Sequence, residues 1–306
     1  MPDYRLFGGI LRSELDFPDL TPTTGHAPRW VLTRKLAVVD TTATEELGRE
    51  EVDAGVSVAL CARAKALRLV FDDTGVFDVS SDGRRIDWFP PAEPNLDSVR
   101  KDVLGRVIAA CLHQEGVLTL HGSAVGIGAS AIAFLAPKFH GKSTIAAALV
   151  RAGARFLADD IVAVSAGAIP VVTPGVPAVH LFRDSAARIA DGSATVRGGD
   201  EAPKLQLTWD DEDRTGGDPM PLAAVYLLAP ADSVHIPSRD RLPGQKAALA
   251  LMGHAKIGAL LGVQRRARLL LQMSELAARV PVFRLSIPRD LARLSETTDA
   301  LTSWHS

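Results

Sequence analysis

The sequence predicts an α/β (α+β) protein in which a β-rich N-terminal domain precedes a mixed-sheet domain. Three observations support this prediction. Alternating apolar residues over 57–90 are interrupted by Asp/Gly pairs, which is typical of β-hairpins. A proline-rich stretch at 90–97, PPAEPNLD, indicates a linker. The rest of the chain alternates between apolar strands and helices, so we expect domains over residues 1–95 and 96–306.

Composition narrows the class of protein. The chain has 306 residues, of which 47% are hydrophobic and 23% charged, and its net charge is 34 − 36 = −2. This balance gives no reason to expect nucleic acid or an anionic membrane as a partner. The N-terminus lacks the pattern of a secretory signal, and no apolar run reaches the length of a membrane span. Cys61 and Cys111 lie in apolar surroundings and are expected to be buried free thiols, which fits a reducing, cytoplasmic location.

Individual elements follow from periodicity. Breaks at Asp73–Gly75 and Asp82–Gly83 place two hairpin turns in the first domain. After the linker, apolar residues at helical spacing predict a helix from an N-cap at Asp97 to about Gln114. Further along we expect strands at 116–128, 130–137 and 154–167, helices at 142–153 and 246–261, and a strand followed by a helix over 280–304.

The stretch APKFHGKST, residues 136–144, lies between a predicted strand and a predicted helix. Gly141, Lys142 and Ser143 fit the phosphate-loop spacing G-x-x-x-x-G-K-[ST], whereas its first position holds Ala136. If that position needs a positive φ, alanine costs about 1 kcal/mol. If it needs only a small residue, alanine serves equally well, and the sequence leaves both cases open.

A phosphate loop presents backbone N–H groups and a helix start to an anion while a lysine neutralises it. Lys142 is therefore expected on the β and γ phosphates, Ser143 on Mg²⁺ and Thr144 near the α phosphate. Lys138 either adds a second positive charge or is a solvated lysine at the loop tip.

Phosphoryl transfer also needs a metal ligand and a group that accepts a proton. Asp159 and Asp160 follow a short apolar run, and neighbours on a strand face opposite sides, so we expect them to have different roles. His121, in LTLHGSAV, is either a phosphate contact, a proton acceptor or a structural residue.

HGSAV (121–125), APKFHGKST (136–144) and LADD (157–160), in this order, resemble the HPr kinase/phosphorylase superfamily, which has the phosphoenolpyruvate carboxykinase-like fold. The resemblance implies a P-loop kinase that uses ATP and Mg²⁺ and adds the expectation of a homo-oligomer. It implies metal binding by Ser143 and Asp160, although which aspartate is the base stays open. The implied catalytic residues are His121, Lys142, Asp159 and Asp160, and the implied nucleotide-binding residues are Ala136, Lys138, His140, Gly141, Lys142, Ser143 and Thr144.

Other segments, at 4–20, 177–189, 202–207 and 283–294, are similar to HPr-kinase-like proteins that tailor lasso peptides. This similarity implies transfer to a serine hydroxyl of a precursor peptide. Lys204, in PKLQL, is then expected to reach the nucleotide or the substrate phosphate, and a surface lysine is the alternative. The small residues of 191–201 are typical of a lid.

Three functions therefore stay open. The leading hypothesis is a Mg²⁺- and nucleotide-dependent serine kinase that acts on a peptide or protein. The second keeps the chemistry and phosphorylates a small molecule such as free serine. The third is an escort that binds nucleotide and a precursor peptide without turnover, using the β-rich domain for recognition.

Overall fold

A computed structural model describes residues 1–36, 44–53, 55–190, 194–199, 203–209 and 214–306. The chain divides into two compact units. The first unit contains residues 1–119 and 255–271, and the second unit contains residues 120–254 and 272–306. Residues 96–119 thus group with the β-rich part of the chain. The domain boundary at residue 95 is not tested by this grouping and stays a prediction.

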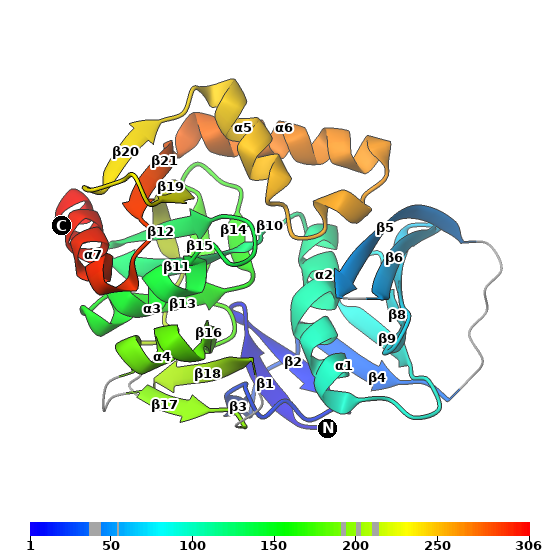
Figure 1. The fold of residues 1–306 in the computed structure, drawn as a ribbon. Coiled ribbons are helices and arrows are strands. Elements are labelled where there is room, and N and C mark those ends of the chain that lie inside the picture. Colours follow the sequence, from blue (N-terminus) through cyan, green and yellow to red (C-terminus); the bar gives the residue numbers. More distant parts are fainter. Residues whose placement is uncertain (37–43, 54, 191–193, 200–202, 210–213) are drawn as a thin grey trace. The chain divides into compact units, whose positions relative to one another are not determined.

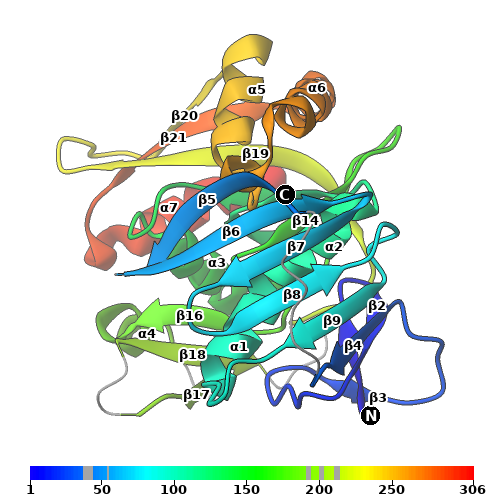
Figure 2. The same cartoon turned by 90° about the vertical axis from the view of Figure 1, so that its right-hand side faces the viewer.

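A mixed sheet forms most of the first unit, with strand order β3-β1-β2-β4-β9-β8-β7-β6-β5 (Figure 2). β2 and β9 pair with β4 in parallel, whereas β5 to β9 pair antiparallel in sequence order. Both expected hairpin turns are confirmed, with Gly75 at φ 96° and Gly83 at φ 74°. The strands are β1 (Asp3–Leu6), β2 (Gly9–Ser13), β3 (Pro22–Thr23), β4 (Trp30–Arg34), β5 (Glu45–Asp53), β6 (Val56–Arg63), β7 (Ala66–Phe71), β8 (Gly75–Val79) and β9 (Arg85–Phe89).

The helix expected after the linker is present in three parts. α1 (Leu96–Asp102) leads into a π-helical turn (Val103–Val107) and then into α2 (Ile108–Gln114). Its N-cap is Asn95 and not Asp97, because the Asn95 side chain accepts hydrogen bonds from the backbone N–H groups of Asp97 and Ser98.

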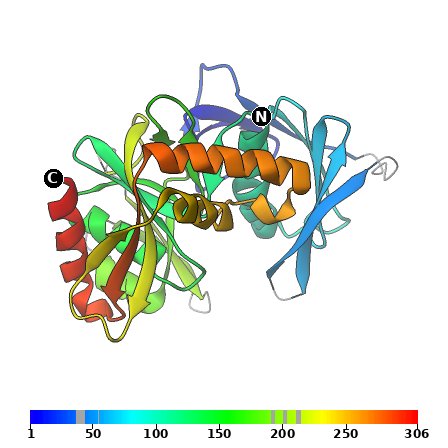
Figure 3. The same ribbon diagram turned by 90° about the horizontal axis from the view of Figure 1, so that it is seen from above.

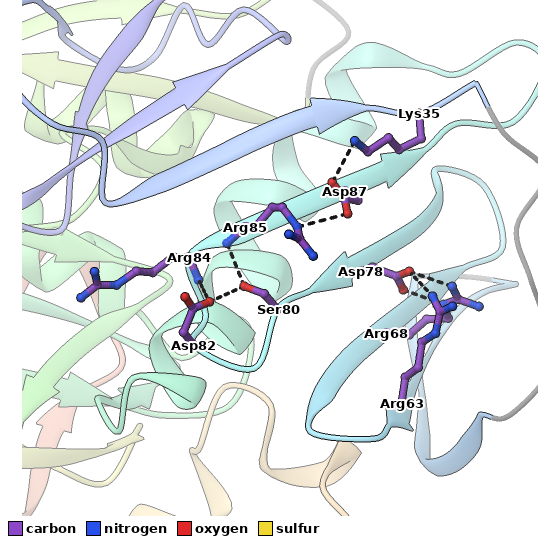
Figure 4. A network of polar contacts seen from close by, with 9 residues as sticks. All are labelled: Lys35, Arg63, Arg68, Asp78, Ser80, Asp82, Arg84, Arg85 and Asp87. Atoms are coloured by element: carbon purple, nitrogen blue, oxygen red, sulfur yellow. Dashed lines mark hydrogen bonds and ion pairs between the residues drawn. The ribbon is translucent and has the colours of Figure 1, made fainter.

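Charged side chains of the first unit pair with one another (Figure 4). Asp78 accepts from Arg68 at 2.6 Å and from Arg63 at 2.9 Å. Asp87 lies 3.3 Å from Lys35 and 3.4 Å from Arg85. These six residues lie on β6 to β9 or, for Lys35, directly after β4. We call them the charge network: Lys35, Arg63, Arg68, Asp78, Arg85 and Asp87. Cys61 and Cys111 are buried free thiols, as the sequence predicts.

The second unit is built on another mixed sheet, in which β14, β15, β19, β12, β11 and β13 follow one another and β21 lies beside β19. β12, β19 and β21 are parallel, β11 is antiparallel to β12, and β13 is antiparallel to β11, so β13 runs in the same direction as β12. In Figure 1, α3 lies between α4 and α7 against this sheet. The elements are β11 (Gly122–Ile127), β12 (Ser130–Leu135), α3 (Lys142–Arg151), β13 (Arg155–Asp159), β14 (Val162–Ser165), β15 (Val171–Thr173), α4 (Arg183–Ile189), β19 (Met220–Ala231), β20 (Ser238–Arg241), β21 (Val282–Pro288) and α7 (Leu294–His305).

A small sheet of the same unit has the order β16-β18-β17, with β16 (Val179–Phe182), β17 (Ala194–Arg197) and β18 (Lys204–Trp209). The predicted lid at 191–201 falls partly outside the described residues. Its described part includes β17, so residues 194–197 form a strand and not a loose loop.

Several predicted elements are confirmed, including the strand at 130–137 and the helix at 142–153. Two are corrected. The strand expected over 154–167 is split into β13 and β14, because Asp160 has a φ of 69°. The helix expected over 246–261 ends early: α5 covers Gly244–Gly253 and a short 3₁₀ turn follows at Gly258–Leu260.

β10 (Leu118–Leu120) carries the chain from the first unit into the second. α6 (Val263–Arg279) is one unbroken helix in Figure 3, and the division between the units falls within it. Within the described ranges, none of the helices has the length and apolar character needed to cross a bilayer.

Candidate active site

Strand register collects the predicted site residues at one edge of the second unit's sheet. Gly122, which begins β11, pairs with Leu135, which ends β12. Ser123 pairs with Asp159, which ends β13. The residues next to these strand ends, His121, Ala136 and Asp160, therefore lie at the same edge.

Gly122 is explained by packing. A Cβ atom on Gly122 would lie 2.5 Å from a methyl group of Leu135 and 2.5 Å from the carbonyl oxygen of Phe134. Only glycine allows β11 and β12 to approach this closely. Gly122 of the His-Gly pair thus has a structural role, and His121 is the residue of the pair that is a candidate for a chemical role.

The loop between β12 and α3 has the backbone that an anion site requires. Gly141 is the N-cap of α3, with φ 85°, and no side chain caps this helix start. Ala136 is 1% exposed and belongs to the hydrophobic core, and it is not among the residues with positive φ. The first position of this loop therefore needs a small residue and not a left-handed one, so alanine adds no backbone strain.

Lys142 lies inside the loop. Its side-chain Nζ donates to the carbonyl oxygens of Ala136 at 2.8 Å and Pro137 at 3.0 Å, and the residue is only 8% exposed. The ammonium group is thus held at the helix start, where it adds to the partial positive charge of the helix dipole.

The two aspartates have different partners, which is compatible with the different roles that the sequence predicts for them. The Asp159 carboxylate accepts from the hydroxyls of Ser123 at 2.6 Å and Ser143 at 2.9 Å, and from the backbone N–H of His180 at 3.4 Å. Asp160 lies beyond the strand, and its carboxylate is 3.1 Å from His121 Nδ1. The separation results from the left-handed backbone of Asp160, which follows the end of β13 at Asp159.

The oxygen atoms around Asp159 fit a hard cation. Ser143 and Asp159 bring a hydroxyl and a carboxylate together at the end of the loop, and these are donor types that Mg²⁺ accepts alongside phosphate oxygens and water. Within the described ranges, no group of three or more His, Cys, Asp or Glu side chains could hold a metal ion.

His254 is a site residue that sequence reasoning missed. Its carbonyl oxygen accepts from the backbone N–H of His121 at 2.6 Å. Burial, together with the nearby charges of Lys142 and His121, lowers the pKa of His254 to about 4. A neutral imidazole thus lies close to the loop. The only sequence signal was Gly253, which ends α5 where a longer helix was predicted.

The remaining predicted residues surround the loop. Thr144 Oγ1 donates to Ser185 Oγ of α4 at 3.3 Å, and His140 Nδ1 lies 2.9 Å from the carbonyl oxygen of Lys138. Lys204 is exposed, and its Nζ lies 5.1 Å from the ring centroid of Phe182. The geometry thus brings the predicted residues to one region, while their roles stay predictions.

No family model matches the chain, and no curated protein matches it. A solved structure that matches is the HPr(Ser) kinase/phosphatase from Coxiella burnetii, with 11% sequence identity and a TM-score of 0.32. The match covers 61% of this chain and 96% of that chain. A similarity of this size carries no argument about function.

Proposed function

We propose that the second unit is a Mg²⁺- and nucleotide-dependent kinase that transfers the γ-phosphate of ATP to a serine hydroxyl. One observation carries the proposal. Three groups lie at one sheet edge: the loop that carries Lys142, a Ser143–Asp159 pair that could bind a metal, and a His121–Asp160 pair that could accept a proton. These are the groups that phosphoryl transfer requires.

The contacts favour Asp159 for the metal, whereas the sequence assignment was Asp160. Asp159 accepts from Ser143, the hydroxyl that a phosphate loop offers to Mg²⁺, and Asp160 faces His121 instead. We therefore assign Ser143 and Asp159 to the cation. When bound, Mg²⁺ supplies charge neutralisation at the β and γ phosphate oxygens.

Asp160 and His121 then act on the acceptor. Asp160 accepts the proton of the serine hydroxyl, and His121 holds the carboxylate in position through Nδ1. The serine oxygen forms a bond to the γ phosphorus as the bond from that phosphorus to the β–γ bridging oxygen breaks. The products are phosphoserine and ADP, and the proton resides on the Asp160–His121 pair until solvent removes it.

Lys142 must change partners for this reaction. Its Nζ leaves the carbonyl oxygens of Ala136 and Pro137 and donates to the β and γ phosphates, where it stabilises the charge of the transition state. His254 stays neutral at pH 7, because its pKa is about 4, so it adds no second positive charge beside Lys142.

The acceptor class is the finer part of the proposal. The sequence resemblance to lasso-peptide tailoring kinases is what favours a serine of a ribosomal precursor peptide over free serine. A binding escort without turnover is the alternative outcome, because Lys142 is already held by its own loop.

The test is transfer from γ-labelled ATP with Mg²⁺, using serine-ended peptides and free serine as acceptors. We expect label on peptide with the wild-type chain and none with Lys142→Met, which keeps most of the side-chain volume. Asp87→Asn, in the charge network of the first unit, is the matched control and should transfer normally. Label on free serine alone would identify a small-molecule kinase. ATP binding without label on any acceptor would establish the escort.

A further inference from the structure

An exposed aromatic pair borders the loop. The ring of Phe139, within the loop, lies 5.6 Å from the ring of Phe182, the last residue of β16, at an interplanar angle of 37°. Phe139 is 79% exposed and Phe182 is 40% exposed. Lys204, opposite Phe182 on β18, places its ammonium 5.1 Å from the Phe182 ring centroid. We call Phe139 and Phe182 the aromatic pair.

Phenylalanine is an energetically unfavourable residue at position 139. Its φ is 68°, a left-handed conformation that is unfavourable for a bulky side chain. Its large apolar surface also gains little from burial, since most of the side chain is exposed. Glycine would avoid both costs. A strained residue that also exposes an aromatic ring, inside a loop built for a ligand, is typical of a ligand contact.

The aromatic pair lies on the side of the loop where a nucleoside is expected. Ser185, three residues after Phe182, accepts a hydrogen bond from Thr144 in the first turn of α3. Thr144 follows the lysine that serves the β and γ phosphates, so this region is next to the α phosphate. The His121–Asp160 pair, which serves the acceptor, lies at the start of β11 and the end of β13.

We propose that the aromatic pair stacks the base of the nucleotide, with Lys204 adding positive charge beside the nucleoside phosphates. The inference rests on the proposed function of the loop. A planar base offers a π-face to an exposed phenylalanine, and the nucleotide's negative charge complements Lys204. An aromatic residue of the acceptor is the competing occupant.

The experiment compares two ligands that share the phosphates and differ in the nucleoside. Calorimetric titration of the full chain measures affinity for Mg·ATP and Mg·tripolyphosphate. We expect the wild type to prefer ATP, and Phe139→Ala to weaken ATP about tenfold while tripolyphosphate changes less than about twofold. Phe139→Tyr keeps a ring and should keep the preference. Ile236→Ala, which removes a side chain that is 77% exposed, is the matched control and should change neither affinity.

Phe139→Gly separates stacking from loop folding. Glycine suits the φ of this position, so the variant should bind tripolyphosphate like the wild type and still lose the preference for ATP. An unchanged ratio of ATP to tripolyphosphate affinity in both the alanine and the glycine variants would overturn the inference. A raised KM for the peptide with an unchanged ratio would also overturn it, in favour of the acceptor. Failure of the wild type to bind either ligand would instead refute the phosphate loop and the proposed function.

Discussion

The charge network of the first unit and the loop of the second unit both concentrate ionisable groups, yet they are satisfied in different ways. In the charge network, carboxylates meet guanidinium and ammonium groups, as Asp78 meets Arg68 and Arg63. At the loop, Asp159 accepts hydrogen bonds from two hydroxyls and a backbone N–H. The Lys142 ammonium donates to two backbone carbonyl oxygens. Opposite charges meet in the first region, whereas hydroxyls, a backbone N–H and backbone carbonyls contribute contacts in the second. Clusters of the second kind can exchange their partners for a charged ligand.

The largest expected effect comes from replacing one aspartate with asparagine in each of the two regions. Asp160→Asn should lower phosphate transfer by about a thousandfold, because the amide cannot accept the serine proton. Asp87→Asn in the charge network should leave transfer unchanged. The measurement is the initial rate with γ-labelled ATP. Equal rates for the wild type and Asp160→Asn would remove the distinction between the two regions.

Asp78→Asn, in the charge network, should instead change the stability of the fold. The side chain of Arg68 is only 3% exposed, and the variant removes its ion pair with Asp78. Breaking a buried ion pair in this way should lower the free energy of unfolding by about 3 kcal/mol. Urea denaturation followed by circular dichroism measures the change. A stability equal to that of the wild type would show that the charge network is not structural.

Asp102, a further ionisable residue of the first unit, should make the stability of the protein depend on pH. It lies in α1 and accepts from Thr74 Oγ1 at 2.7 Å, and burial raises its pKa to about 6. Because the folded-state pKa lies above the unfolded value of 3.8, the folded state binds this proton more tightly. The resulting stabilisation is present below pH 3.8 and is lost as the pH rises through 6.

We therefore expect Asp102→Asn to raise stability at pH 7 by up to about 3 kcal/mol, since each pKa unit corresponds to about 1.4 kcal/mol. Denaturation midpoints between pH 4 and pH 7 provide the measurement. The difference between variant and wild type should shrink towards pH 4, and a difference that does not depend on pH would contradict the assignment of the raised pKa to Asp102.

The smallest effect concerns the first position of the loop. Ala136→Gly restores the usual phosphate-loop glycine, yet Ala136 is buried and its φ is not positive. We expect a loss of about 1 kcal/mol in stability from added chain entropy and no gain in ATP affinity. A clear gain in ATP affinity would show that alanine does impair the loop. Thermal unfolding and ATP titration of the two proteins test this together.

Local signals predicted much of what lies around the site. The strand, loop and helix over 130–153 and both hairpin turns followed from periodicity and turn residues. The break at Asp160 did not, because an apolar run on both sides of an aspartate pair favours one strand, and only the fold imposes a left-handed residue there. The pairing of Asp159 with Ser143, and the approach of His254 to His121, depend on contacts between distant segments that no local pattern encodes.

The discontinuity of the first unit has a consequence for synthesis. Its sheet precedes residue 119, but residues 255–271 belong to it as well. In the 3₁₀ turn of this later segment, the Leu260 carbonyl approaches β5 so closely that a Cβ atom on Gly48 would lie 2.8 Å from it. The first unit therefore cannot be completed until residues 255–271 have been made. A nascent chain must keep the β5 surface uncovered while more than a hundred further residues are made, as residues 120–254 separate the two parts.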